Sequence, residues 1–142
     1  MALLFITEND LKTGSFVSVI TDSINDYAAA AEEIEKNNIA LIKGKIGTRY
    51  DVSAIFSATG NNRNRTIVKV LTILVLYDLI RRNAMRKVPD DYKEDWNWAM
   101  KWLDAVRDGK ESPQDLPIID TTTGDSLSEV LYGNNSNQDF RL

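Results

Sequence analysis

The longest apolar stretch of the chain runs from Thr66 to Ile80, TIVKVLTILVLYDLI, and eleven of its fifteen residues are apolar. At about 100° per residue, these side chains cover nearly the whole circumference of a helix and leave a thin polar strip at Lys69 and Thr72. A membrane span needs roughly 20 apolar residues, whereas this run is shorter and contains Lys69 and Asp78. A buried strand of about 4–8 residues is too short to account for it. The pattern therefore predicts the central helix of a small all-α helical bundle.

Two helices are predicted before this segment. The first predicted helix starts within residues 5–12, with Thr7 as its N-cap and acidic residues in its first turn, and it ends at Gly14. The second is predicted from about 23 to 46, because it contains a run of four alanines, the residue of highest helix propensity. Its expected apolar face contains Tyr27, Ala31, Ile34, Leu41 and Ile42, and its expected solvent face contains Glu32, Glu33, Glu35 and Lys36. Residues 15–21 alternate weakly, and the pattern leaves their structure open.

A fourth helix is predicted after the central one. Pro89 and the two aspartates that follow are typical of a helix N-terminus, and Gly109 is typical of its end. One face carries apolar side chains at spacings of four and three: Tyr92, Trp96, Ala99, Leu103 and Val106. Trp98 lies about 120° from the middle of that face, with Trp102 between. Two interpretations of Trp98 are open: it covers an edge of the bundle, or it is an anchor in an oligomer interface, where Trp is enriched.

The connection before the central helix, residues 47–64, is predicted to be a long internal loop. It contains four sizeable apolar side chains, which argue against disorder: Tyr50, Val52, Ile55 and Phe56. We expect them either to pack on the bundle or to contact a neighbouring subunit, and the sequence leaves both possibilities open.

The chain changes in character near residue 113. Residues 1–112 contain equal numbers of acidic and basic side chains, whereas 113–142 contain five acids and one base, so the net charge of −4 lies entirely there. Apolar residues recur among the polar ones as candidate contact residues: Ile118, Ile119, Leu127, Leu131, Tyr132 and Phe140. We therefore expect a helical body, 1–112, and an extended C-terminal arm, 113–142, that docks on a partner.

No catalytic signature is visible. The chain has no Cys and no His, which excludes disulfides and removes the commonest general base and metal ligand. Without a Gly-rich phosphate loop or metal-ligand spacing, we expect no enzyme activity, cofactor or metal.

The N-terminus lacks the basic region of a secretory signal, so we expect synthesis in a cytoplasm and no membrane association. The helix dipole explains the basic residues near the end of the central helix, Arg81, Arg82, Arg86 and Lys87, with phosphate or nucleic-acid binding as the alternative.

Four segments in this order resemble a known family: FITENDLK at 5–12, RYDV at 49–52, LYDLIRR at 76–82 and VPDDYKEDWNWAMKWLDAVRDGK at 88–110. Their sequence and spacing, taken together, are similar to those of tailed-phage head–tail connector proteins, including the Mu-like prophage head-completion group. The likeness covers roughly residues 3–117. The chain departs from the usual pattern in having no proline in the loop after Tyr50 and a long tail beyond Pro117.

The resemblance implies a structural virion protein, made in the host cytoplasm, that forms a ring at the head–tail junction, commonly of twelve copies. Such a ring contacts the portal protein on one side and the tail or a further connector on the other. DNA passes through without sequence-specific binding. Two rival functions are a helical interaction or regulatory module whose tail folds on a partner, and a nucleic-acid binder that uses Arg63, Arg65, Arg81, Arg82, Arg86 and Lys87. The neutral body counts against the second rival.

Overall fold

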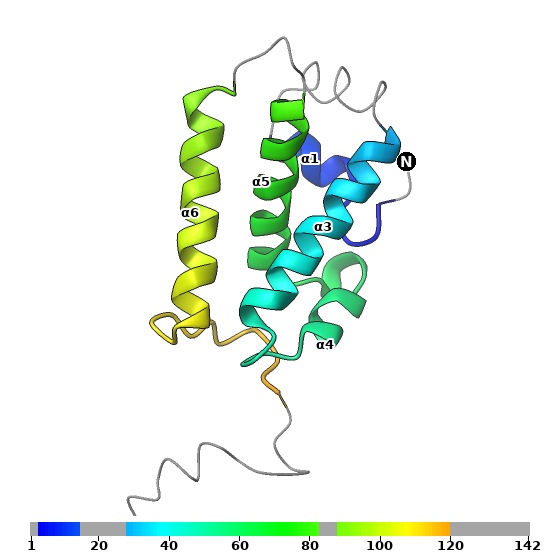
Figure 1. Cartoon of the computed structure of the whole chain (residues 1–142). Helices are drawn as coiled ribbons and strands as arrows, with labels where there is room; N and C mark the ends of the chain where they lie inside the picture. Colours follow the sequence, from blue (N-terminus) through cyan, green and yellow to red (C-terminus); the bar gives the residue numbers. More distant parts are fainter. Residues whose placement is uncertain (1–2, 15–27, 83–87, 120–142) are drawn as a thin grey trace, which may run out of the picture.

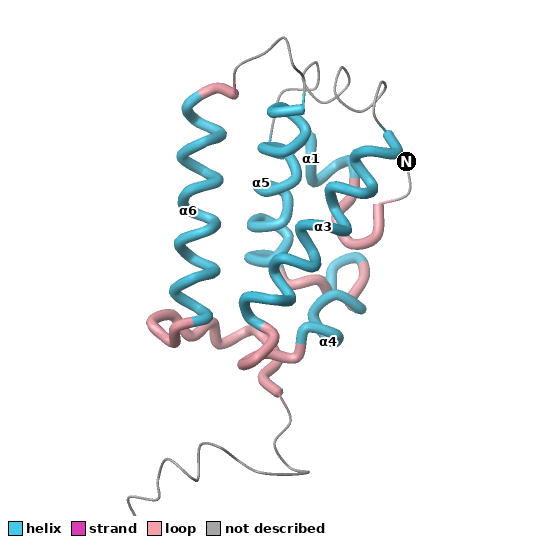
Figure 2. The backbone as a smooth tube through the Cα atoms, in the orientation of Figure 1, coloured by secondary structure: helices cyan, strands magenta, loops and turns pink. Residues whose placement is uncertain are grey.

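Helix α5, Arg65–Arg82, is the element against which α1, α3 and α6 pack (Figure 1). The structure, a computed structural model, describes residues 3–14, 28–82 and 88–119. These residues form α1 (Glu8–Gly14), α3 (Ala28–Ile46), α4 (Val52–Ser57), the short 3₁₀ helix η1 (Gly60–Asn62), α5 and α6 (Asp90–Arg107). Across those ranges the chain forms helices and loops and no strand (Figure 2), which confirms the all-α class.

The central position of α5 follows from its composition. Ten of its eighteen residues are buried, and they point in all directions from the helix axis. The helix can bury them because α3 and α6 pack along its length and α1 packs beside it. Each Leu, Ile or Val side chain buried in this way contributes about 1.5–3 kcal/mol relative to exposure. The prediction of a central apolar helix is therefore confirmed.

Helix α6 packs on α5 through the predicted face. Ala99, Leu103 and Val106 are fully buried, while Tyr92 and Trp96 are half-buried. The helix ends at a glycine with φ of +80°, Gly109, as predicted. Two backbone hydrogen bonds close this end, from Gly109 N–H to the Val106 carbonyl at 3.2 Å and from Lys110 N–H to the Ala105 carbonyl at 2.8 Å. They form a Schellman motif, which needs a residue of positive φ at the glycine position.

Helix α1 begins at the predicted N-cap. The Thr7 Oγ1 accepts a hydrogen bond from the Asp10 N–H at 3.2 Å, and the Asp10 carboxylate accepts one from the Thr7 N–H at 2.8 Å. This reciprocal pair is a capping box with Asp in place of the usual Glu. It fixes the direction in which the chain enters the bundle.

Helix α3 differs from the prediction in the face that it buries. Its most buried positions follow helical spacing and include two polar residues: Ala31, Glu35, Asn38, Ile42 and Ile46. The predicted solvent-facing position of Glu35 is therefore wrong, and Leu41, expected on the apolar face, is exposed. The reason is a contact distant in sequence: the Glu35 carboxylate accepts hydrogen bonds from the backbone N–H groups of Leu4, Phe5 and Ile6. Buried N–H groups need such partners. Residues 23–27 of the predicted helix lie outside the described residues.

The connection 47–64 is not the long loop that was predicted, because it contains α4 and η1. The carboxylate of Asp51 caps α4 by accepting a hydrogen bond from the Ala54 N–H at 3.1 Å. One turn of helix lets Ile55 reach the core while Ser57 and Ala54 stay at the surface.

Residues 110–119 return along the lower end of the bundle in Figure 1. Leu116 is buried in the same core as α5. Residues 117–119 lie antiparallel to 49–51, with an isolated β-bridge between Tyr50 and Ile118. Two backbone hydrogen bonds flank this bridge. The Asp51 N–H donates to the Pro117 carbonyl at 2.8 Å, and the Ile119 N–H donates to the Arg49 carbonyl at 3.3 Å. The first part of the predicted arm therefore packs on the body. Residues 120–142 lie outside the described residues.

Candidate interaction surfaces

The four apolar residues predicted in the connection 47–64 divide into two pairs. Tyr50 and Ile55 belong to the core of the described chain, so of the two possibilities that the sequence leaves open these two residues take the first, packing on the bundle. The β-bridge to Ile118 holds Tyr50 in place and the first turn of α4 turns Ile55 inward. Val52 and Phe56 are half-buried. The Phe56 ring packs edge-on against the Phe5 ring, with centroids 5.0 Å apart.

Trp98 lies at the surface of α6. Its side chain is 42% exposed, and the Lys69 Nζ lies 4.8 Å from the centroid of its ring. A cation over an indole face is an attractive contact. Trp98 therefore covers the edge of α5 at Lys69 and also leaves apolar surface open to solvent, so the structure leaves both interpretations open. Trp102, one turn later, is half-buried.

Ile118 and Ile119 form the second exposed apolar surface. Ile118 is 71% exposed and Ile119 is 38% exposed, although the backbone of both is held against 49–51. Two adjacent exposed isoleucines on a fixed backbone agree with the prediction that these residues are available for contact, although exposed apolar residues are also common on surfaces that bind nothing. The remaining predicted contact residues, Leu127, Leu131, Tyr132 and Phe140, lie outside the described residues.

Arg49 connects the segment that carries Ile118 and Ile119 with the C-terminal end of α6. Its guanidinium donates a hydrogen bond to the Val106 carbonyl at 3.3 Å, at the C-terminal end of the helix dipole. This contact spans 57 positions in sequence. Sequence reasoning singled out Arg49 only as part of the motif RYDV, since no local signal indicates such a distant partner.

An ion pair fixes the loop before α5 against α1. The Arg63 guanidinium lies 2.7 Å from the Asp10 carboxylate, both side chains are mostly buried, and Arg63 also donates to the Phe5 carbonyl at 2.9 Å. Burial raises the pKa of Asp10, but hydrogen bonds from Arg63 and Thr7 outweigh it and hold that pKa below its ordinary value. Arg63, a residue of the nucleic-acid rival, is therefore engaged within the chain.

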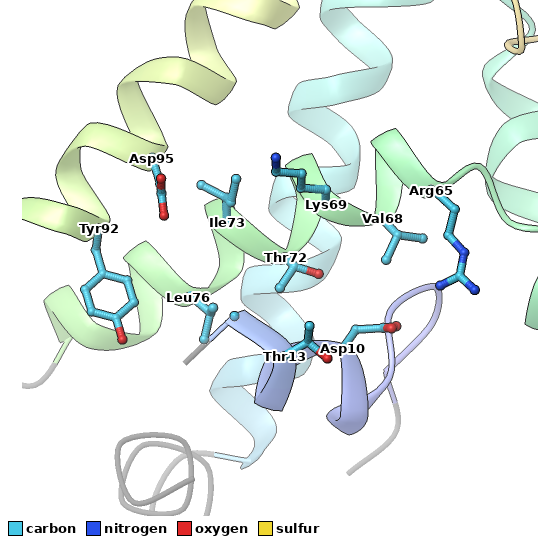
Figure 3. Close-up of a pocket in the computed structure, with 11 residues that line it drawn as sticks. Asp10, Thr13, Arg65, Val68, Lys69, Thr72, Ile73, Leu76, Tyr92 and Asp95 are labelled. Atoms are coloured by element: carbon cyan, nitrogen blue, oxygen red, sulfur yellow. The ribbon is translucent and has the colours of Figure 1, made fainter. Parts of the chain in front are cut away.

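A groove of about 410 Å³ lies between α1, α5 and α6 (Figure 3). Its walls include Val68, Ile73 and Leu76 of α5, with Thr13 and Gly14 of α1 opposite. Arg65 lies toward one end, Tyr92 toward the other, and Lys69 near the middle (Figure 3). Both residues of the predicted polar strip of α5, Lys69 and Thr72, line this groove.

The described residues contain no group of three side chains able to hold a metal ion. No helix in ranges 3–14, 28–82 and 88–119 is long and apolar enough to cross a bilayer. Comparison of the chain with models of known families, with curated proteins and with solved structures finds no match.

Proposed function

We propose that the chain is a structural head–tail connector of a tailed bacteriophage, located in the virion at the junction of head and tail. One observation carries the proposal. Two of the segments that resemble the family, RYDV at 49–52 and the helix segment at 88–110, meet in space through the hydrogen bond from Arg49 to the Val106 carbonyl. A shared contact gives a physical reason for two separated motifs to occur together.

The proposed connector assembles with copies of itself in a ring, commonly of twelve, beneath the portal protein. Its other partner is the tail or a further connector, and DNA passes through without sequence-specific contacts. The side chains proposed for subunit and partner contacts are the exposed and half-buried apolar ones: Val52, Phe56, Trp98, Trp102, Ile118 and Ile119. The arm residues Leu127, Leu131, Tyr132 and Phe140 complete the set.

Native mass spectrometry tests this proposal on the purified full chain, alone and mixed with a candidate portal protein. A closed ring, or a portal complex of fixed stoichiometry, is the expected result. A monomer that does not bind the portal contradicts it.

The second candidate is a small helical interaction or regulatory module without a ring. The groove between α1, α5 and α6 favours it, because a concave and mostly apolar surface of this kind suits a segment of a single partner. A one-to-one complex with a single partner would support this candidate over the connector.

A further inference from the structure

Helix α5 begins with an unfavourable arrangement of charge. Arg65 is its first residue, Lys69 follows four positions later, and the first turn contains no acidic residue. A cation is disfavoured at the N-terminal end of a helix, because that end of the helix dipole is positive. Residues four positions apart are neighbours on a helix surface, so the two like charges also repel each other. The helix alone therefore gives no reason for these two cations.

Neither cation is neutralised within the described part of the chain. The Arg65 side chain is exposed and makes no hydrogen bond or ion pair in residues 3–14, 28–82 and 88–119. The Lys69 Nζ lies 4.8 Å from the ring centroid of Trp98, and this indole carries no net charge. Both cations line the groove between α1, α5 and α6, so the groove presents two positive charges that the described chain leaves unpaired.

The acidic residues near these cations do not supply the missing partner. Asp10 lines the groove, but its carboxylate is in the ion pair with α5's preceding loop described above. Asp115 shares a second cavity with Arg65, but its carboxylate accepts a hydrogen bond from the Asn64 side chain at 2.8 Å. Asp95 lines the groove nearer the end opposite Arg65 (Figure 3). An anionic group at Arg65 and Lys69 must therefore come from another molecule.

Apolar surface lies beside the two cations. Ile73 and Tyr92 line the groove and are half-buried. Trp98 is 42% exposed and contacts Lys69, so it continues the apolar surface beyond the groove along α6. Tryptophan is enriched among the residues that contribute most to binding in protein interfaces. A surface that combines cations with exposed apolar side chains suits a protein segment that carries both acidic and apolar residues.

We propose that this groove binds a segment of a partner protein in which an acidic residue lies beside apolar ones. Its carboxylate lies at Arg65 and Lys69, and its apolar side chains contact Ile73 and Trp98. Charge complementarity favours this occupant, because a basic or neutral segment leaves both cations without a partner. An alkyl carboxylate also supplies the charge, but such a ligand is normally enclosed in its pocket, whereas Trp98 extends the surface outside this groove. The inference rests on the second candidate function, whose partner chemistry it names.

Selection from a peptide library on the purified full chain tests this preference. The peptides are random and about twelve residues long, enough to follow α5 from Arg65 to Leu76 as a helix. We expect enrichment of Asp or Glu next to Leu, Ile or Phe. The variant Arg65→Gln/Lys69→Gln should lose this enrichment. The control Lys101→Gln/Lys110→Gln removes two exposed cations that do not line the groove, and it should keep the enrichment.

A titration followed by nuclear magnetic resonance locates the binding. The most enriched peptide is synthesised together with a copy in which each Asp and Glu is replaced by Asn and Gln. The acidic peptide should shift the amide signals of Lys69 and Ile73 and the indole N–H signal of Trp98. The amide copy should bind about three- to tenfold more weakly, as expected for the loss of two exposed charge pairs. This difference should shrink at high salt, which screens exposed charges.

The melting temperature of Arg65→Gln/Lys69→Gln tests the premise about charge. It should stay the same or rise slightly, because the variant removes the repulsion between the two cations. A clear fall would assign the cations a role in the fold and would overturn the proposal.

Three binding results would also overturn it: selection without acidic enrichment, enrichment that survives in Arg65→Gln/Lys69→Gln, or decanoate that shifts the groove signals where no peptide does. The last result would make an amphiphile the occupant. A natural partner that forms a one-to-one complex through another surface would leave the second candidate function intact, so failure of the groove chemistry is distinguishable from failure of that function.

Discussion

The guanidinium of Arg49 occupies the space that a side chain at Gly109 would need. A Cβ atom at position 109 would lie 2.6 Å from the Arg49 Nη1, and Gly109 has a φ of +80°. Gly109 therefore serves two purposes, since it closes α6 in the left-handed conformation and leaves room for the arginine that binds the Val106 carbonyl.

Replacing this glycine should destabilise the fold. We expect Gly109→Ala to lower the free energy of unfolding by about 1–3 kcal/mol, because the alanine is strained at positive φ and displaces Arg49. Urea denaturation followed by circular dichroism measures the change. The matched control is Gly44→Ala, a helical position with open space around it, where alanine should stabilise by up to about 1 kcal/mol. Equal effects at the two positions would contradict the role assigned to Gly109.

The buried carboxylate of Glu35 supports a second prediction. Glu35→Ala leaves the N–H groups of Leu4, Phe5 and Ile6 without their acceptor. Unsatisfied buried donors cost about 1–3 kcal/mol, so the melting temperature should fall and the amides of residues 4–6 should exchange with solvent faster. Glu33→Ala, at an exposed position of the same helix, is the control and should change neither quantity much. Unchanged exchange at residues 4–6 in Glu35→Ala would show that the carboxylate does not hold this segment.

The examples of Glu35 and Arg49 show which parts of the structure the sequence could predict. Periodicity and capping residues are local, and they predicted α1, α5, α6 and the end of α3. The partners of Glu35 and Arg49 lie about 30 and 57 positions away, and their contacts depend on tertiary packing. Helix α4 is six residues long, too short for a periodic signal, although Asp51 before it is a recognisable N-cap. Among the candidate contact residues, Trp98, Ile118 and Ile119 are exposed. Tyr50 and Ile55 are buried, and the sequence could not show this because their burial depends on segments that are distant along the chain.

The ion pair between Asp10 and Arg63 predicts a dependence of stability on acid. The pKa of Asp10 is held below its ordinary value of 3.8 in the folded chain, so folding favours the ionised carboxylate. This contribution is complete above the unfolded pKa and is lost as the pH falls through the lower folded pKa. Denaturation at a series of pH values between about 2 and 6 should show the loss in the wild type. The variant Asp10→Asn should lack this part of the pH dependence, and an unchanged slope in the variant would contradict the assignment.

Trp98 should matter more for assembly than for the stability of the single chain. Its side chain is 42% exposed, and the contact with Lys69 is worth about 0.5–1 kcal/mol at an exposed site. Under the proposed function, we expect Trp98→Ala to reduce assembly into a ring or a portal complex, as seen by native mass spectrometry, while changing the melting temperature only slightly. Trp96→Ala is the comparison, because Trp96 is half-buried and stacks on Tyr77 with ring centroids 5.1 Å apart, so its loss should lower the melting temperature more. If the two variants lose equal stability, Trp98 is a structural residue of the bundle edge.

Truncation should separate the part of the C-terminal region that stabilises the body from the part that assembles. Deleting 113–142 removes the buried Leu116 and the backbone pairing of Pro117 and Ile119 with 49–51, so it should expose Tyr50 and lower the melting temperature clearly. Deleting only 120–142 keeps these contacts, and the melting temperature of this shorter truncation should stay closer to that of the full chain.

Under the proposed function the shorter deletion nevertheless abolishes assembly with the partner, because it removes Leu127, Leu131, Tyr132 and Phe140. Scanning calorimetry of both truncations, together with native mass spectrometry, measures the two effects separately. Normal assembly of the chain that ends at residue 119 would exclude residues 120–142 from the partner interface and leave Trp98, Ile118 and Ile119 as the exposed contact residues.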